Sequence, residues 1–194
     1  YTSAGVYTGT SFSVASQDTQ PRGITWDGTH FWVVGQTSNG VYQYTSAGVY
    51  TGNNLAVGSQ DTLAEDVVWD GTYFWVVGNS TNSVYKYNAS SVYQNVSFSV
   101  GSEEGTPSGI TWDGTNFWVV GSNSDTVYKY NASGVYQNIK FSVKTQDQTP
   151  SGITWDGTNL WMVGYITDAV YKYKPLVGVP TDSSFGAQNY VRVA

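Results

Sequence analysis

The sequence predicts an all-β protein, a four-bladed β-propeller, and three observations support this fold. First, the chain repeats: Trp26, Trp69, Trp112 and Trp155 follow one another at a spacing of 43 residues. Second, each repeat contains four short segments rich in Val, Thr, Tyr, Trp and Phe, which favour strands and are separated by Gly and Asn turn residues. Third, four antiparallel strands in a repeat of this length match one propeller blade.

Each repeat divides into four predicted strands, which we call a, b, c and d. Strand a reads Gly-Ile-Thr-Trp in most copies and ends at Asp-Gly, a signal for a tight hairpin turn. Strand b reads Phe-Trp-Val-Val, strand c Val-Tyr-Lys-Tyr, and strand d Ser-Phe-Ser-Val in two copies. Blades therefore begin at about residues 22, 65, 108 and 151. The composition argues against a helical solenoid; an elongated β-solenoid and a duplicated β-sandwich remain alternatives.

The order of the strands predicts how the ring closes. One strand d, residues 6 to 14, precedes the first strand a, and the last repeat lacks a strand d because the pattern stops at Lys174-Pro175. The N-terminal strand can fill this vacancy and complete the C-terminal blade. We therefore expect a propeller over residues 1 to 174 and a separate tail over residues 175 to 194. The alternative is that the chain is a piece of a larger propeller.

Composition and charge exclude several partners. Asp, Glu, Lys and Arg make up 11% of the chain, against roughly 25% in typical globular proteins. The net charge of −6 provides no cationic field for phosphates, so we expect neither nucleic-acid binding nor membrane insertion. The chain has no cysteine, no apolar run of membrane-spanning length and no recognisable secretory signal, so composition alone does not fix its compartment.

The repeats resemble those of β-propeller proteins with NHL/YVTN-like blades. The resemblance is carried by Gly-Ile-x-x-Asp-Gly-x-x-hydrophobic-Trp-Val followed by Val-Tyr-x-Tyr, and it covers residues 1 to 173. The blades are especially similar to repeats in large phage-encoded and bacterial surface proteins. This resemblance implies the fold and an extracellular or virion-surface location. It implies no catalytic residues, because propellers have many functions.

The tryptophans allow two interpretations. All eight lie in strands a and b, and their recurrence could form a multivalent surface for stacking sugars. However, both faces of a blade pack against neighbouring blades, so apolar side chains are expected on both sides of these strands. We therefore predict that the tryptophans form core.

Two sets of acidic residues recur with the repeat. The first follows strand a; its carboxylates could hold a cation such as calcium, but we expect each to stabilise its own Asp-Gly turn. The second lies in the d-to-a loops and is a better candidate for binding a cation or a polyol. The first set is Asp27, Asp70, Asp113 and Asp156, and the second is Asp18, Asp61, Glu104 and Asp147. We expect no obligatory cofactor.

The b-to-c loops differ most between repeats, which suggests that the scaffold does not dictate their sequence. Binding residues often lie on loops of a rigid frame, and Ser, Asn, Thr and Asp suit the hydroxyl groups of glycans. Tyr165 adds a stacking face. The candidate binding residues in these loops are Asn39, Asn82, Asp125, Tyr165 and Asp168. Four similar sites would allow multivalent binding; solvated turns without a ligand are the alternative.

The sequence gives little support for an enzyme. His30 is the only histidine, and its equivalents are Tyr73, Asn116 and Asn159, so we expect it to be an exposed turn residue. No nucleophile elbow, zinc-binding HExxH motif or phosphate loop is present. New acid pairs occur only in Ala-Glu-Asp at 64 to 66 and Glu-Glu at 103 to 104.

The sequence therefore predicts a non-enzymatic surface module that binds glycans or proteins through the b-to-c and d-to-a loops. The alternative is a structural subunit of a phage fibre, capsid decoration or extracellular filament, assembled through residues 175 to 194. These residues end in a strand-like Asn-Tyr-Val-Arg-Val. If the protein is glycosylated, Asn88 and Asn131 in the Asn-Ala-Ser turns are the expected sites.

Overall fold

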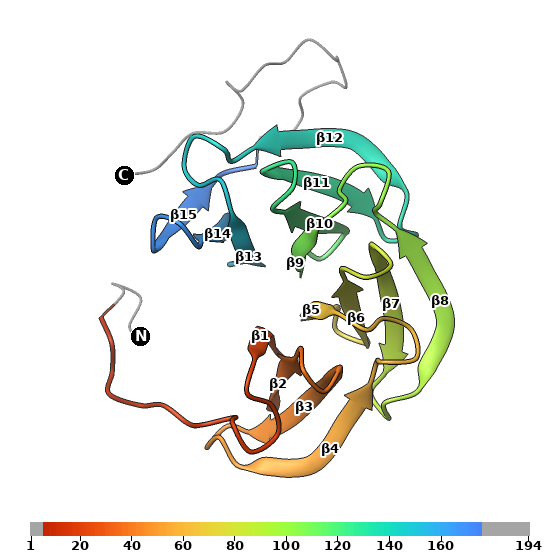
Figure 1. The fold of residues 1–194 in the computed structure, drawn as a ribbon, viewed down its shortest axis with the longest axis vertical. Helices are drawn as coiled ribbons and strands as arrows, with labels where there is room; N and C mark the ends of the chain where they lie inside the picture. Colours follow the sequence, from red (N-terminus) through yellow and green to blue (C-terminus); the bar gives the residue numbers. More distant parts are fainter. Residues whose placement is uncertain (1–5, 176–194) are drawn as a thin grey trace.

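The structure is a computed structural model, and it describes residues 6–175. It is all-β over this range, with four antiparallel sheets that form the blades of a propeller (Figure 1). The described residues include no helix that could cross a membrane.

Blade 1 comprises β1 (Pro21–Trp26), β2 (His30–Gly35), β3 (Gly40–Thr45) and β4 (Tyr50–Ala56). Blade 2 comprises β5 (Ala64–Trp69), β6 (Tyr73–Gly78), β7 (Ser83–Asn88) and β8 (Tyr93–Ser99). Blade 3 comprises β9 (Pro107–Trp112), β10 (Asn116–Gly121), β11 (Thr126–Asn131) and β12 (Tyr136–Ser142). Blade 4 comprises β13 (Pro150–Trp155), β14 (Leu160–Gly164) and β15 (Ala169–Tyr173).

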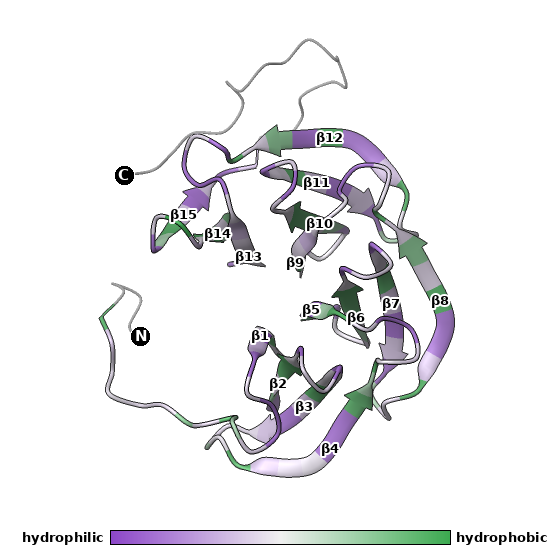
Figure 2. Cartoon of the chain, in the orientation of Figure 1, coloured by the Kyte–Doolittle hydropathy of each residue, from purple (hydrophilic) through white to green (hydrophobic). Residues whose placement is uncertain are grey.

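Each sheet follows chain order, so the predicted strands a to d are neighbours in space. In blade 3, Trp118 of β10 lies opposite Thr111 of β9 and opposite Lys129 of β11. The first strand of each blade lies nearest the centre, and β4, β8 and β12 form the outer rim (Figure 1). The rim strands carry many hydrophilic residues, whereas β6 and β10 are strongly hydrophobic (Figure 2). The four-bladed propeller architecture predicted from the repeat is confirmed.

The Asp-Gly turn of each blade is held by its own aspartate. In blade 3, Asp113 Oδ1 accepts hydrogen bonds from the backbone amides of Thr115 (2.9 Å) and Asn116 (2.7 Å). Its other oxygen accepts a hydrogen bond from the Trp118 indole at 2.7 Å. Gly114 supplies the positive φ of 93° that the turn requires. The same indole contact recurs in the other blades at 2.6 to 2.7 Å. These aspartates therefore serve their turns, as expected.

The core lies between successive blades. Trp32, Trp75 and Trp118 of strand b are at most 4% exposed, and each packs against the next blade along the chain. For example, Trp75 of blade 2 lies 4.8 Å from Phe117 of blade 3, ring centre to ring centre. The prediction that the tryptophans form core is confirmed for these three residues. Trp161 of blade 4 is only half-buried.

The strand a tryptophans are less buried than the core prediction requires. Trp69, Trp112 and Trp155 are half-buried, and Trp26 is 42% exposed. In the first three blades each packs on a phenylalanine of strand b; the Trp112 and Phe117 rings, for example, are 4.5 Å apart. Their outer surfaces line a second cavity, described below. The core interpretation is therefore incorrect for one side of these rings.

The predicted closure of the ring does not occur in the structure. Within residues 6–175, residues 6 to 14 form no strand, β15 pairs only with β14, and blade 4 therefore has three strands. Figure 1 shows an open arc with its gap between β1 and the β13–β15 sheet. The N-terminal segment instead follows blade 1, where the Phe12 ring lies 5.8 Å from Phe31 and 5.5 Å from Tyr44. The predicted tail lies outside the described residues, apart from Pro175.

Trp118→Ala is expected to destabilise the fold by about 3 to 5 kcal/mol, because it leaves a cavity at a blade interface and removes the indole hydrogen bond to Asp113. The free energy of unfolding in denaturant would measure this. Trp26→Ala, which removes a partly exposed ring, is the matched control and should cost less. Equal losses would contradict the assignment of Trp118 to the core.

Candidate functional site

A cavity of about 460 Å³ lies at the centre of the arc, where the first strands of all four blades begin. Its walls come from the starts of β1, β5, β9 and β13 and from the first residue after strand b in blades 2 to 4. We call it the polar cavity, because Arg22, Glu65, Asn79 and several Ser and Thr side chains line it. Every blade contributes to this one site.

The residues of the polar cavity differ from blade to blade, although the framework does not. The second residue of strand a is Arg22, Glu65, Ser108 and Ser151 in blades 1 to 4. The residue after strand b is Gln36, Asn79, Ser122 and Tyr165. By contrast, the Asp-Gly turn and both tryptophans are identical in all four repeats. The cavity is therefore chemically asymmetric on a nearly symmetric frame, which suits a ligand without fourfold symmetry.

A polar network joins blades 1 and 2 at this cavity. Gln36 Nε2 donates a hydrogen bond to Glu65 Oε1 at 2.8 Å, and the Arg22 guanidinium donates to the Gln36 side-chain oxygen. Arg22 Nε lies 3.7 Å from Glu65 Oε2. Burial raises the pKa of Glu65 above its ordinary value, and the nearby Arg22 charge only partly opposes this shift. The network presents one cation and one carboxylate to the cavity.

Tyr165 is the most exposed aromatic side chain of the polar cavity, at 71%. It occupies the b-to-c loop position where blades 2 and 3 have Asn79 and Ser122. An exposed phenol ring above a cavity lined by hydroxyl and amide groups can stack on a sugar ring while those groups form hydrogen bonds with its hydroxyls. The structure places Tyr165 at this cavity, and its role in binding stays a prediction.

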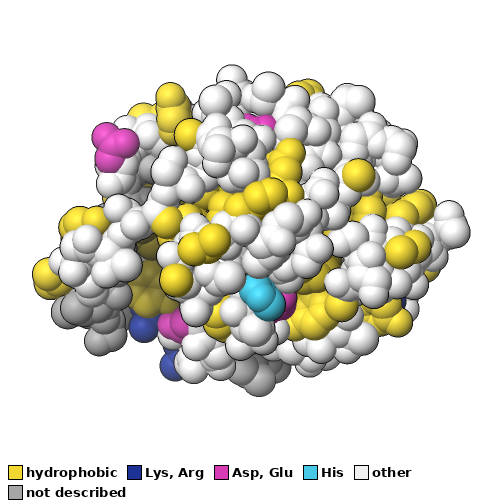
Figure 3. All heavy atoms as spheres, turned by 90° about the horizontal axis from the view of Figure 1, so that it is seen from below, with side chains coloured by type: hydrophobic (Ala, Val, Ile, Leu, Met, Phe, Trp, Pro, Cys, Tyr) yellow, Lys and Arg dark blue, Asp and Glu magenta, His cyan; other side chains and the backbone are white. Residues whose placement is uncertain are grey.

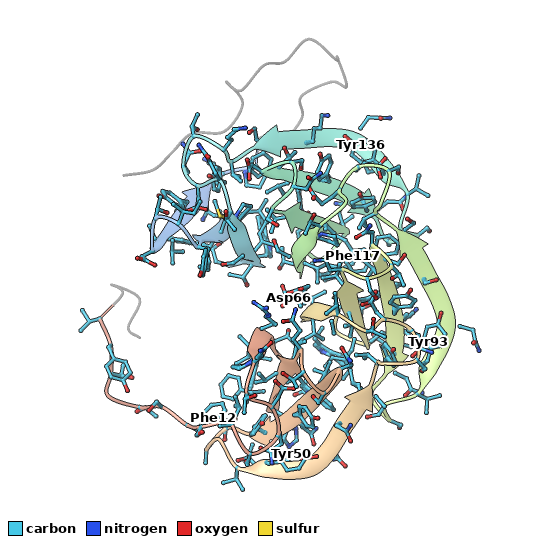
Figure 4. The ribbon with its side chains drawn as sticks, in the orientation of Figure 1. Phe12, Tyr50, Asp66, Tyr93, Phe117 and Tyr136 are labelled. Atoms are coloured by element: carbon cyan, nitrogen blue, oxygen red, sulfur yellow. The ribbon has the colours of Figure 1, made fainter. Side chains whose placement is uncertain are left out.

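Asp66 is a buried carboxylate beside this cavity, at a position where the other three blades have glycine. Its oxygens accept hydrogen bonds from the backbone amides of Val67 (2.8 Å) and, across the blade interface, Ile110 (2.9 Å). It also fills the space beside Gly23 of blade 1, where a Cβ would lie 1.9 Å from Asp66 Oδ1. Asp66 thus contacts three blades at the inner edge of the arc (Figure 4). Burial raises its pKa to about 7.

The four acids predicted in the d-to-a loops are buried and hold the b-to-c loops in place. All four are at most 6% exposed; they are Asp18, Asp61, Glu104 and Asp147. Asp61, for example, accepts hydrogen bonds from the Leu63 amide (2.7 Å), the Ser80 hydroxyl (2.8 Å) and the Thr81 amide (2.9 Å). Their burial gives no support to direct ligand contact, so that role stays a prediction. The hydrogen bonds show that each carboxylate joins its d-to-a loop to the b-to-c loop of the same blade.

Two consequences follow for these loop-joining acids. Burial raises the pKa of Asp147, but hydrogen bonds from Thr167 and Thr149 outweigh it and leave the pKa below its ordinary value. The glycine that ends strand b is also explained, because a Cβ at Gly78 would lie 2.1 Å from the Asp61 carboxyl carbon. The acid and the glycine therefore fit together as a pair in every blade.

Four other predicted binding residues occupy one turn position. Asn39, Asn82, Asp125 and Asp168 have φ angles of 49° to 51°, the left-handed conformation that Asn and Asp tolerate best. Asp125 is buried, Asn39 and Asn82 are half-buried, and Asp168 is exposed. Turn geometry therefore accounts for their residue type. Ligand contact by them stays a prediction.

A second cavity, of about 400 Å³, opens where the strands a end, and we call it the aromatic cavity. Trp26, Trp69, Trp112 and Trp155 line it together with threonines of β1, β9 and β13. It differs from the polar cavity in having no charged side chain in its lining. Four indole faces around one space give a surface on which an apolar or planar group can stack.

The remaining predictions concern histidine, metals and sequons. His30 begins β2 and is half-buried; its Nδ1 lies 3.8 Å from Asp27 Oδ2, and Figure 3 shows the single histidine at the surface. Among residues 6–175, no three His, Asp or Glu side chains gather in a way that could hold a metal ion. Asn88 and Asn131 each accept two backbone hydrogen bonds within their turns. Their glycosylation stays a prediction.

Comparison with solved structures supports the fold and nothing finer. A streptogramin B lyase superposes with a TM-score of 0.59 at 18% identity, over 81% of this chain and 52% of the lyase. A glutaminyl cyclase from Myxococcus xanthus superposes with a TM-score of 0.61 at 12% identity, over 80% of this chain and 66% of the cyclase chain. A chain of a nidogen/laminin complex superposes with a TM-score of 0.51 at 11% identity, over 79% of this chain and 75% of the other. The chain thus spans about half the length of the lyase.

These similar proteins are propellers with different roles, and some are enzymes. Comparison by sequence finds no matching family model and no matching curated protein. The structure of this chain is therefore that of a β-propeller, and a binding or structural module is compatible with it. A more specific role has to be argued from the cavities.

Sequence reasoning missed part of the polar cavity. Arg22 and Asn79 are not among the predicted binding residues, and Glu65 enters the sequence analysis only as half of an acid pair. The signal was present, because the second position of strand a changes in charge between the aligned repeats while its neighbours in the strand vary less.

Asp61→Ala is expected to lower the free energy of unfolding by about 1 to 3 kcal/mol, because it leaves buried donors of the Ser80–Thr81 loop without partners. Chemical denaturation would measure the loss. Asp61→Asn retains one acceptor oxygen and should lose less. An unchanged stability for Asp61→Ala would contradict the structural role of this acid.

Asp66→Asn tests the buried carboxylate by its pH dependence. The folded pKa of about 7 lies above the ordinary value of 3.8. Protonation of the Asp66 carboxyl therefore stabilises the folded state below pH 4, and this stabilisation is lost as the pH rises through 7. As the pH rises from 4 to 8, the free energy of unfolding of the variant should increase, relative to that of the natural protein, by up to about 4 kcal/mol. Unfolding measured at both pH values checks this. A difference that stays constant with pH would show that Asp66 titrates normally.

Proposed function

We propose that the chain is a non-enzymatic binding module whose ligand is a glycan, held in the polar cavity and stacked against Tyr165. The observation that carries this proposal is the asymmetry of the cavity. Its residues change from blade to blade, whereas the framework residues around it repeat. Folding alone does not require that the residue after strand b differ in all four blades, as Gln36, Asn79, Ser122 and Tyr165 do.

The chemistry of the cavity favours a polyhydroxylated ligand over a strongly charged one. Arg22 and Glu65 are the charged groups of its lining, and they lie close enough to compensate each other. The remaining polar groups are hydroxyls and an amide, which both donate and accept hydrogen bonds. A protein loop rich in Ser and Asn offers similar groups and is the other class of ligand that the proposal must exclude.

The location that we propose is an extracellular or virion surface. The resemblance of its blades to those of surface proteins supports this location. The proposed absence of catalysis is supported by the buried, hydrogen-bonded state of the recurrent acids and by the pairing of Glu65 with Gln36 and Arg22 in the polar cavity.

A structural role is the second candidate, and one observation favours it. The sheets at the two ends of the arc expose apolar side chains that are buried in the other blades, including Ile24 and Val170. The sequence-based version of this role, assembly through residues 175 to 194, concerns residues outside the described part of the chain. The end sheets are considered separately below.

Tyr165→Ser is expected to weaken glycan binding at least about 10-fold, because stacking on an aromatic face is lost while the fold is retained. Serine occupies the equivalent position 122, so the framework accepts it. A glycan array would identify a bound sugar, and calorimetry would compare the variants. Ile166→Asn, which also copies blade 3, is the matched control and should bind normally.

Two results would contradict the proposal. Absence of saturable binding to any glycan on the array would remove the ligand class. Binding that survives Tyr165→Ser but is lost in Trp155→Leu would move the site to the aromatic cavity.

A further inference from the structure

The blades of this chain pack through two complementary faces. The trailing face of a blade carries the strand b tryptophan and two valines, and the leading face of the next blade receives them. In blade 1 the trailing face is formed by Trp32, Val34 and Val41. In blade 2 the leading face is formed by Val67, Phe74 and Val76. The same arrangement recurs between blades 2 and 3 and between blades 3 and 4.

In the described part of the chain, the trailing face of blade 4 has the residues of an interface but no partner blade. Val163 is 44% exposed and Val170 is 59% exposed. Their equivalents in blades 1 to 3 are all fully buried: Val34, Val77 and Val120 for the first position, and Val41, Val84 and Val127 for the second. Exposure of such residues indicates a surface that a partner covers.

The leading face of blade 1 is exposed in the same way. Ile24 is 56% exposed, whereas its equivalents Val67, Ile110 and Ile153 are 2 to 7% exposed. Phe12 packs on Phe31 and Tyr44, as Phe98 of blade 2 packs on the equivalent residues of blade 3. Phe12 therefore already occupies, on blade 1, the position of the phenylalanine of a preceding strand d (Figure 4).

We propose that a second copy of this chain covers the two end faces, head to tail. Blade 4 of one copy packs on blade 1 of the other, and residues 6 to 14 of that second copy add the missing fourth strand to blade 4. The chain contains three interfaces between equivalent faces, so the proposed contact repeats an interface of known geometry.

The internal blades also give the register of the added strand. In blade 3, Thr126 of β11 lies opposite Ser142, and Val127 lies opposite Phe141. The equivalent pairs are Ala169 with Ser13 and Val170 with Phe12. Phe12 would then cover Val170, and the backbone groups of Ala169 and Val170 would pair with the new strand.

Head-to-tail contacts between copies can cover both the leading face of blade 1 and the trailing face of blade 4. A head-to-tail contact uses two different faces, so it closes into a ring when the rotation between copies allows it and otherwise continues as a filament. In the structure the two end faces of one chain stand on opposite sides of the gap (Figure 1). The inference concerns the end faces and is independent of the ligand proposed for the polar cavity.

Association is tested first with a charge on the trailing face. The natural chain should form dimers or larger species in light scattering or analytical ultracentrifugation, and Val170→Asp should raise the dissociation constant at least about 100-fold. Val170 is exposed in one copy, so this variant should stay folded. Val135→Asp is the matched control; Val135 is 57% exposed and lies away from the end faces, in the turn before β12. A natural chain that is monomeric at every concentration would overturn the proposal, as would association unaffected by Val170→Asp.

The second test identifies which strands pair, and it uses the absence of native cysteine. In the double variant Ser13→Cys, Ala169→Cys, cross-strand neighbours are close enough to form a disulfide under mild oxidation. Disulfide-linked dimers or larger species on a non-reducing gel support pairing between copies. A disulfide within one chain would show that the chain closes on itself and would overturn the proposal. The pair Ser13→Cys, Val135→Cys is the control and should not cross-link.

Discussion

The hydrogen bond between an aspartate and a tryptophan indole is the contact on which the rest of each blade depends. In blade 3 the Asp113 carboxylate holds the Asp-Gly turn with one oxygen and the Trp118 indole with the other. The turn fixes the register of strands a and b, and the indole packs against the next blade. One side chain thus connects local turn geometry to the contact between blades, and all four repeats contain it.

Most of the fold could be predicted from the sequence, because its signals are local. Asp-Gly turns, alternation within strands and the 43-residue spacing define the hairpins directly. Ring closure could not be predicted in this way. The angle between blades depends on how the side chains at each interface pack, and a strand inventory contains no information about that angle. The prediction that residues 6 to 14 form the fourth strand of blade 4 is therefore wrong for this structure, in which Phe12 packs on blade 1.

The candidate site was harder to predict for a similar reason. A repeat alignment places Asp61 in a loop but does not show that its carboxylate points inward to the Ser80–Thr81 loop. It also does not show that the second residues of the four strands a meet at the centre. Tyr165 was found because it is an aromatic residue in a polar loop. Arg22 was missed because strand a was expected to be only structural.

The near identity of the interfaces between blades also affects how such a chain can change over time. A gene that gains or loses one 43-residue unit by recombination encodes a chain in which every contact between blades already exists in its parent. No new surface has to become complementary, because equivalent trailing and leading faces already match. Blade number can therefore vary more easily than blade sequence, and the side chains of the polar cavity would be rearranged at each such step.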